Sequence, residues 1–327
     1  MRWRRSPQGR LSLVATAAVL CAGGIGAGVT GASAPALARS LAAGRAEAGP
    51  IAVNCLSAAH PRLAARLTRG IHAALSGRSS RVALRVYDKS EDLNCWLNST
   101  THFDSASVVK VTILGTLLRE AETQHRHLTA SEVRLARLMI IQSDNNAASA
   151  LWAHVGRGRL RYFLGRAGMK QTQLGPGGYW GLTQITAHDE LLLLNLLMDT
   201  NTVLNAASRT FALNLMAQVI PSQRWGVPAG APANMTVHVK NGWLPLATHG
   251  WRIHSIGCFT GHHRGYSIVV LTEDNPTMAY GVTTIQLAAK VIHRQLNPTA
   301  TTFRPAPAPA PSWGKPDEQI PASLGGR

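Results

Sequence analysis

The chain has 327 residues, and its apolar fraction of 45% is enough to bury the core of one medium domain or two small ones. Its formal net charge is +17, from 33 basic and 16 acidic residues, yet no zinc-finger, helix-turn-helix or RNA-binding signature accompanies that charge. Composition therefore excludes a mainly disordered chain and argues against nucleic acid as a partner. Two explanations of the charge remain: the protein contacts an anionic cell wall, or it simply has a solvated basic surface.

The first 38 residues have the three parts of a secretory signal. Arginines at positions 2, 4, 5 and 10 precede an apolar run over residues 11–29, and Ala36 and Ala38 then form a small-residue cleavage site. We therefore expect Sec-type export, an extracytoplasmic protein and no stable membrane insertion after cleavage. An uncleaved anchor is the alternative, which the many glycines and alanines of this run disfavour. A flexible leader is expected over residues 39–53.

Beyond the leader the apolar pattern alternates between strand and helix periods. The expected elements, in chain order, are a helix over 61–75, strands over 82–88 and 95–98, helices from 107 to about 225, strands over 235–240, 253–260 and 266–272, and a helix over 282–296. Two of the helices begin with cap patterns, Thr129 with Glu132 and Thr186 with Asp189.

Strands at both ends of the chain, with helices between them, predict an α/β fold of the α+β kind. We expect one antiparallel sheet built from both chain ends, with flanking helices and an inserted all-helical lobe over about residues 100–228. The folded domain is expected over residues 54–298, and a disordered Pro/Ala-rich tail over 299–327.

Cleavage of the signal would leave three cysteines. Export permits a disulfide, and Cys55 with Cys95 is the pair that would tie the N-terminal extension to an early strand. Cys258 lies in an apolar strand-like run and is expected to be a buried thiol. No Cys or His spacing matches a metal site, so neither a metal nor a cofactor is predicted.

The segment after Phe103 carries the first chemical signal. Asp104 and Ser105 can cap a helix, and the helix that follows would place Ser107 and Lys110 one turn apart on one face. A serine hydroxyl is a poor nucleophile, but a buried amine with a lowered pKa can accept its proton. The spacing therefore suggests an activated serine, although Ser-x-x-Lys also arises by chance with a solvated lysine.

Two more polar motifs follow. Ser143, Asp144 and Asn145 come after an apolar helical run, and Lys240 begins a Lys-Asn-Gly motif inside a strand-like run. Because the chain has few lysines and two of them fall in these motifs, chance becomes the weaker explanation. Asp144 is expected to brace its turn rather than to react.

With these motifs in this order, the sequence resembles the class A β-lactamase-like serine hydrolases, which are penicillin-recognising active-site serine enzymes. The resemblance covers about residues 59–296 and includes the strand-like segment 265–272. It implies a β-lactamase/transpeptidase-like fold with the site in a groove between sheet and lobe. The third motif departs from the family, which usually has Thr or Ser where this chain has Asn241.

The resemblance also implies roles for individual residues. Ser107 would be the nucleophile, Lys110 its base and Ser143 a proton relay, while Lys240 would attract a substrate carboxylate and support the relay. The backbone N–H groups of Ser107 and Trp243 would form the oxyanion hole. The residues expected to bind substrate are Asn145, Asn241, Gly242 and Trp243. Trp243 could equally be a core aromatic, and Arg252 is expected on the surface.

A second departure from the family concerns hydrolysis of the acyl-enzyme. Class A β-lactamases carry a glutamate in the loop before Thr186 that activates the deacylating water, but residues 145–187 contain neither Asp nor Glu. An acyl-enzyme is then expected to form and to be hydrolysed slowly. His188 or Asp189 could replace the glutamate, although a helix cap explains both of them better.

Three functions follow from these observations. The first is an exported, monomeric serine hydrolase acylated at Ser107 by β-lactams or related amides. The second is a D,D-peptidase acting on peptidoglycan stem peptides, which needs no loop glutamate. The third is a penicillin-binding or sensing protein that does not turn over.

Overall fold

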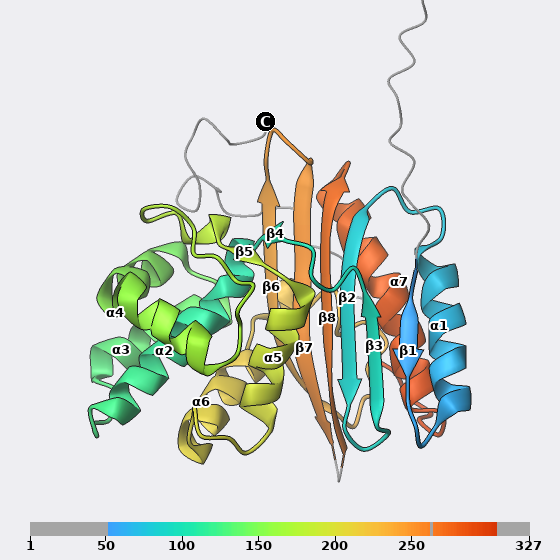
Figure 1. Cartoon of the computed structure of the whole chain (residues 1–327), viewed down its shortest axis with the longest axis horizontal. Helices are drawn as coiled ribbons and strands as arrows, with labels where there is room; N and C mark the ends of the chain where they lie inside the picture. The colour runs from blue at the N-terminus through green and yellow to red at the C-terminus, as the bar shows by residue number, and fades with distance from the viewer. Residues whose placement is uncertain (1–51, 262–263, 306–327) are drawn as a thin grey trace, which may run out of the picture. The chain divides into compact units, whose positions relative to one another are not determined.

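The computed structural model describes residues 52–261 and 264–305, so the predicted signal, the leader and most of the tail lie outside the described residues. One six-stranded antiparallel sheet has the order β1-β3-β2-β8-β7-β6. Helices α1 and α7 cover one face of this sheet, and the other helices lie on the opposite face (Figure 1). The predicted α+β architecture is confirmed.

The strands come from both ends of the chain. They are β1 Asn54–Leu56, β2 Arg81–Asp88, β3 Leu93–Leu97, β4 Phe103–Asp104, β5 Gln184–Ile185, β6 Thr236–Pro245, β7 Trp251–Gly261 and β8 Arg264–Asn275. Early and late strands meet where β2 pairs with β8, with Val86 opposite Ile268. Strands β4 and β5 form a separate two-stranded sheet.

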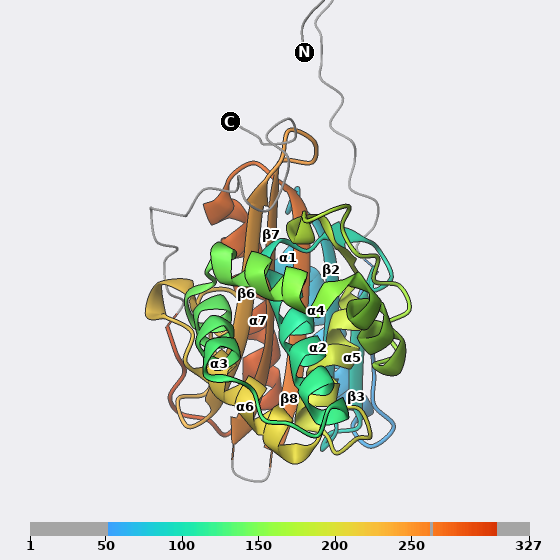
Figure 2. The same cartoon turned by 90° about the vertical axis from the view of Figure 1, so that its left-hand side faces the viewer.

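The helices are α1 Pro61–Leu75, α2 Lys110–Thr123, α3 Ala130–Arg137, α4 Asn145–Arg166, α5 Ala187–Met198, α6 Ala206–Ala217 and α7 Met278–Leu296. Figure 2 shows α2, α3, α4 and α6 in front of the sheet, as the inserted lobe. None of the helices in the described ranges is both long and apolar enough to cross a lipid bilayer.

Local sequence explains where several helices begin. Pro61 occupies the first turn of α1, where a missing N–H costs nothing. At α3, Thr129 and Glu132 form both bonds of the predicted capping box. At α5, the Thr186 hydroxyl accepts the backbone N–H of Asp189 at 3.1 Å, also as predicted.

The segment before Ser107 differs from the expected cap. Asp104 lies in β4 opposite Gln184, and no side chain caps the turn that follows. A short 3₁₀ helix, Ala106–Val109, leads into α2 at Lys110. The reason is a long-range interaction, because the Asp104 carboxylate pairs with Arg252 at 3.0 Å instead of with its own helix.

The ordered chain also reaches past the boundary expected at residue 298. Thr302 accepts the backbone N–H of Ala233 at 3.0 Å, and Arg304 donates its own to Ala231 at 2.7 Å. Elsewhere a disulfide joins Cys55 to Cys95 across β1 and β3, and Cys258 is a buried free thiol.

Candidate active site

A single 3₁₀ turn brings Ser107 and Lys110 together. The backbone N–H of Lys110 donates to the Ser107 carbonyl oxygen, and side chains three residues apart lie over one another in such a turn. Both residues are buried, with Ser107 3% exposed and Lys110 not exposed at all. An amine so placed is removed from bulk water, which is the condition for it to act as a base.

Ser143 reaches the same region from the other side of the lobe. It follows a π-helical turn, Leu138–Gln142, and has a left-handed backbone with φ of 58°. Asp144 then starts α4, its carboxylate accepting the backbone N–H of Ala147 at 2.7 Å. Non-glycine residues in this conformation are costly and concentrate at functional sites. The turn aims the Ser143 hydroxyl at the two lysines.

Two buried lysine side-chain amines converge on the Ser143 hydroxyl. The Lys110 Nζ lies 3.1 Å from Ser143 Oγ, and the Lys240 Nζ lies 2.8 Å from it. Lys110 also donates to the Ser143 carbonyl at 2.6 Å and to Asn145 Oδ1 at 2.8 Å. Burial lowers the pKa of Lys240 to about 7, so this amine changes charge near neutral pH. The arrangement can pass a proton between amines through a hydroxyl.

Strand β6 runs directly beside the Ser107 turn. A Cβ atom added to Gly242 would lie 2.9 Å from the Ser105 carbonyl oxygen and 3.0 Å from the Ser107 nitrogen. Only glycine allows the two backbones to approach this closely. The edge of the sheet therefore forms one wall of the site, next to the backbone N–H of Ser107.

Two of the predicted binding residues do not face this cluster. Successive side chains of a strand point to opposite faces, so Asn241 and Trp243 point away from Lys240. The Asn241 amide donates to the carbonyl of Gln223 at 2.8 Å and to that of Trp225 at 2.9 Å. Any contact of Asn241 or Trp243 with a ligand at Ser107 would therefore come from the backbone.

The opposite wall is the loop between Gln173 and Gln184, whose backbones pair with each other at its neck. Its central residue is Trp180, which is fully buried, with its ring centre 4.7 Å from Lys110 Nζ. The indole N–H donates to Ser149 Oγ at 3.0 Å. Sequence reasoning missed Trp180, because a glycine-rich loop has no periodicity that marks a buried position.

His188 and Asp189, which could replace the missing glutamate, have other hydrogen-bonding partners. Asp189 is fully buried, and its Oδ2 accepts the backbone N–H of Gln171 at 2.9 Å and both the N–H and the hydroxyl of Thr172, at 2.7 and 2.8 Å. His188 Nδ1 lies 3.1 Å from Asp189 Oδ1. Asp189 therefore braces the chain that leads into the loop.

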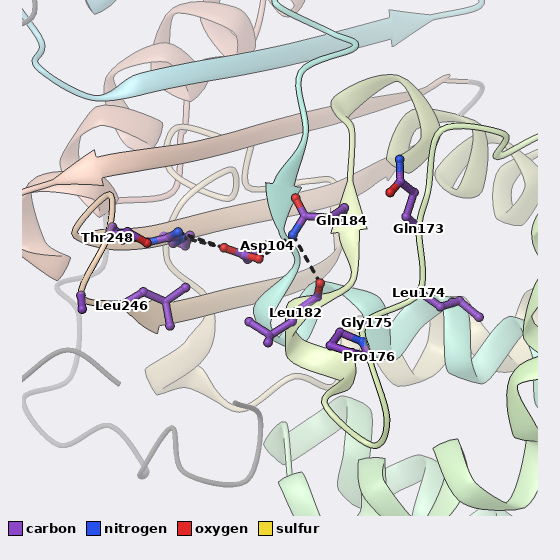
Figure 3. A pocket seen from close by; sticks show the side chains of 11 residues that line it. Asp104, Gln173, Leu174, Gly175, Pro176, Leu182, Gln184, Leu246 and Thr248 are labelled. Carbon is purple, nitrogen blue, oxygen red and sulfur yellow. Dashed lines mark hydrogen bonds and ion pairs between the residues drawn. The ribbon is translucent and has the colours of Figure 1, made fainter. Parts of the chain in front are cut away.

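The prediction that Arg252 lies on the surface is wrong, because this residue is only 3% exposed. It pairs with Asp104, and both line a cavity of about 450 Å³ between the loop and the β6–β7 turn. Figure 3 shows Asp104 and Gln184 between the loop residues Gly175 and Pro176 and the turn residue Thr248. Such a mixed polar and apolar cavity beside the Ser107 turn can hold part of a ligand.

Among the described residues, His249, Glu273 and Asp274 place their ligand atoms within 4.8 Å of one another, as a metal site would need. However, Arg81 already pairs with Glu273 at 2.5 Å, and His249 pairs with Asp274 at 2.9 Å. These ion pairs account for the cluster without a metal.

Comparisons with known proteins identify the family and the fold. The sequence pattern of the Beta-lactamase enzyme family matches residues 124–296, which is more than half of the chain. No curated protein matches the sequence. The chain belongs to the β-lactamase enzyme family, and with its fold this makes it a member of the β-lactamase-like serine hydrolase superfamily.

Solved structures share the fold at low identity. A class A β-lactamase from Bacteroides cellulosilyticus matches with a TM-score of 0.63 and 18% identity, over 72% of this chain and 98% of that one. The TLA-1 extended-spectrum β-lactamase has a TM-score of 0.64 and 16% identity, over 71% and 98%. PBP-A has a TM-score of 0.61 and 16% identity, over 71% and 96%. At these identities the likeness concerns the fold alone.

Proposed function

We propose that this protein is an exported serine hydrolase that forms an acyl-enzyme at Ser107 with β-lactams or related amides. The observation that carries the proposal is the convergence of two buried lysine side-chain amines on Ser143 Oγ, beside the Ser107 turn. Burying two amines beside one hydroxyl is costly, because these groups lose water as a hydrogen-bonding partner. Proton transfer gives this cluster a chemical purpose.

In the proposed acylation, the Ser107 oxygen attacks the amide carbonyl carbon while neutral Lys110 takes the hydroxyl proton. The carbonyl oxygen becomes an oxyanion, which the backbone N–H groups of Ser107 and Trp243 would stabilise. The C–N bond then breaks, and the departing nitrogen receives the Ser143 proton. Lys110 returns a proton to Ser143, so the site ends with one ester and neutral amine and hydroxyl groups.

Lys240 and Asn145 would bind substrate in this scheme. Lys240 donates to Ser143 Oγ at 2.8 Å and to the Asn241 carbonyl at 2.9 Å, so its third N–H is left for a substrate carboxylate. Asn145 holds Lys110 through Oδ1, which leaves its NH₂ group for the carbonyl oxygen of a substrate amide. Lys240 and Asn145 would together select a substrate that carries both a carboxylate and an amide.

A second activity, D,D-peptidase action on peptidoglycan stem peptides, is supported by the loop. Residues 145–187 contain no carboxylate, and the ring centre of the Trp180 indole, which cannot accept a proton from water, lies 4.7 Å from Lys110 Nζ. Peptidases of this kind need no loop glutamate. Release of D-alanine from a synthetic peptide ending in D-Ala-D-Ala, faster than hydrolysis of a chromogenic cephalosporin, would favour this activity over the first.

Export is supported by the disulfide between Cys55 and Cys95, because such bonds persist outside the reducing cytoplasm. The basic composition would also favour contact with an anionic cell wall. We expect the substrate to be a small β-lactam or a peptide-like amide. Recovery of the protein in the extracytoplasmic fraction, beginning near residue 39, would test the export proposal.

Labelling with a fluorescent penicillin tests the proposed activity. We expect a stoichiometric covalent label on the wild type that Ser107→Ala abolishes. Ser131→Ala is the matched control, because Ser131 is exposed on α3 and should leave labelling unchanged. No label and no cephalosporin hydrolysis by the wild type, or a label that survives Ser107→Ala, would contradict the proposal.

A further inference from the structure

Two buried residues of β7 reach the segment that leads into Ser107. Arg252 and His254 are two positions apart on this strand, so their side chains share one face, and both bind Asp104, three residues before the proposed nucleophile. We propose that Arg252 and His254 are positioning residues, which hold the backbone N–H of Ser107 in place through Asp104. This inference rests on the proposed function and extends it to residues outside the lysine and serine cluster.

Asp104 is held at both its side chain and its backbone. Arg252 donates from Nε and Nη2 to carboxylate Oδ2, each at 3.0 Å, and Gln184 donates to Oδ1 at 2.5 Å (Figure 3). His254 Nε2 donates to the Asp104 carbonyl oxygen at 2.8 Å. These bonds fix the orientation of the residue, because neither its side chain nor its peptide group can rotate without breaking one of them.

The hydrogen bonds of His254 also determine which ring nitrogen carries the proton. Nδ1 accepts the backbone N–H of Thr272 on β8 at 3.2 Å, so the proton is on Nε2, which faces Asp104. The residue is fully buried, and burial lowers its pKa to about 4, which keeps the ring neutral near pH 7. The ring is therefore a fixed hydrogen-bonding bridge from the sheet to Asp104.

The residue directly before Ser107 is in a conformation that must be held. Ala106 has a left-handed backbone with φ of 45°, which is unfavourable for any residue with a Cβ atom. Its side chain is fully buried and packs with Leu244 and Leu246. Such a backbone relaxes unless the residues on either side of it are fixed, and Asp104 is the fixed residue on the N-terminal side.

The neighbouring strand limits the position of the Ser107 N–H from another direction. His254 is the cross-strand partner of Gly242 on β6, where an added Cβ atom would lie 3.0 Å from the Ser107 nitrogen. The Ser105 N–H donates to the Thr183 carbonyl oxygen at 2.8 Å, which attaches the turn to the loop. A shift of this segment by about 1 Å would move the proposed oxyanion donor out of place.

The test measures the limiting rate of adduct formation and the half-saturating concentration of penicillin G, by intact-mass spectrometry. His254→Phe removes the bond to Asp104, and we expect the limiting rate to fall by about 30-fold while the half-saturating concentration changes by less than about threefold. His254→Gln keeps an N–H donor near the position of Nε2 and should lose less than about fivefold.

His293→Phe is the matched control. His293 on α7 is also a fully buried histidine with two hydrogen bonds, to the Tyr266 hydroxyl at 2.7 Å and to the Val227 carbonyl oxygen at 2.8 Å. The loss of these bonds should lower stability to a similar extent. Because none of them involves the Ser107 segment, the limiting rate should stay at the wild-type value.

A second substitution separates positioning from a general loss of stability. Glycine adopts a positive φ without a steric cost, so Ala106→Gly removes the need to hold this backbone. In the His254→Phe background, Ala106→Gly should therefore raise the limiting rate by about threefold or more. A double variant no faster than His254→Phe would contradict the proposed role.

Equal limiting rates in His254→Phe and His293→Phe would overturn the inference and leave the proposed function standing. If His254→Phe does not fold, Arg252→Met replaces it, because it removes the bonds to the Asp104 carboxylate and keeps the bond to the carbonyl. A wild-type limiting rate in Arg252→Met would then overturn the inference. Absence of any adduct on the wild type would overturn both proposals.

Discussion

The two walls of the candidate site differ in chemistry. The wall formed by the Ser143 turn and β6 is polar, with two buried lysine amines on one hydroxyl. The loop wall presents an indole to the same Lys110 and carries no acid anywhere between residues 145 and 187. In the proposed function, the polar wall supplies the groups that form an ester, whereas the loop wall offers no carboxylate to assist its hydrolysis. The two halves of an acyl-transfer reaction can therefore be separated within one fold.

The largest expected effect tests the polar wall. Lys110→Met keeps the side-chain length and removes the amine, so Ser107 loses its proton acceptor. We expect penicillin labelling to slow by about 10³-fold. Circular dichroism should show a folded protein, and Lys170→Met, at an exposed lysine, is the matched control. Labelling within about threefold of the wild-type rate would remove Lys110 from the proposed mechanism.

Gly242→Ala tests the contact between β6 and the Ser107 turn. The added methyl group would lie 2.9 Å from the Ser105 carbonyl oxygen, which is closer than packing permits, so strand and turn must separate. We expect labelling to slow by about 30-fold because the reacting groups move apart. Gly158→Ala adds a methyl group in open space on α4 and should have no effect. An unchanged rate in Gly242→Ala would show that this close approach is not needed.

The pH dependence of substrate affinity tests the charge of Lys240. Because burial lowers the pKa of Lys240 to about 7, its charged fraction falls as pH rises through 7. We expect the affinity for a carboxylate-bearing penicillin to fall by about tenfold between pH 6 and pH 8. Lys240→Arg keeps its charge over this range and should flatten the profile. A profile that is the same in both proteins would exclude Lys240 as the titrating group.

The smallest expected effect concerns the loop wall. Arg157→Ala removes the bonds to the Leu174 and Gly175 carbonyl oxygens, which should loosen the loop around Trp180. We expect the adduct lifetime to shorten by about threefold, since a side-chain hydrogen bond contributes about 1 kcal/mol. Arg161→Ala, at an exposed arginine of the same helix, is the control. A lifetime equal to or longer than that of the wild type would show that these two bonds do not affect hydrolysis of the adduct.

The sequence predicted the features that depend on local pattern. The caps at Thr129 and Thr186 follow from short spacings, and the order of strands and helices follows from periodicity. The spacing of Ser107 and Lys110 likewise identified a turn that the structure contains. These features need no knowledge of distant residues.

Features that depend on distant partners were not predictable in this way. Arg252 was assigned to the surface because its partner, Asp104, lies in a strand far back in the chain. Asn241 was expected to bind substrate, and the sequence could not show that the carbonyls of Gln223 and Trp225 hold its side chain on the other face of β6. Trp180 lies in a loop without periodicity, so only the fold reveals that it meets Lys110.

The most direct test of the central claim is a peptide map of the protein after brief exposure to penicillin G. If Lys110 activates Ser107 and Lys240 supports the proton relay through Ser143, tandem mass spectrometry will place one penicilloyl group on Ser107. The group will remain there for many minutes. An adduct on another residue, or a wild-type protein that carries no adduct at all, would contradict the account.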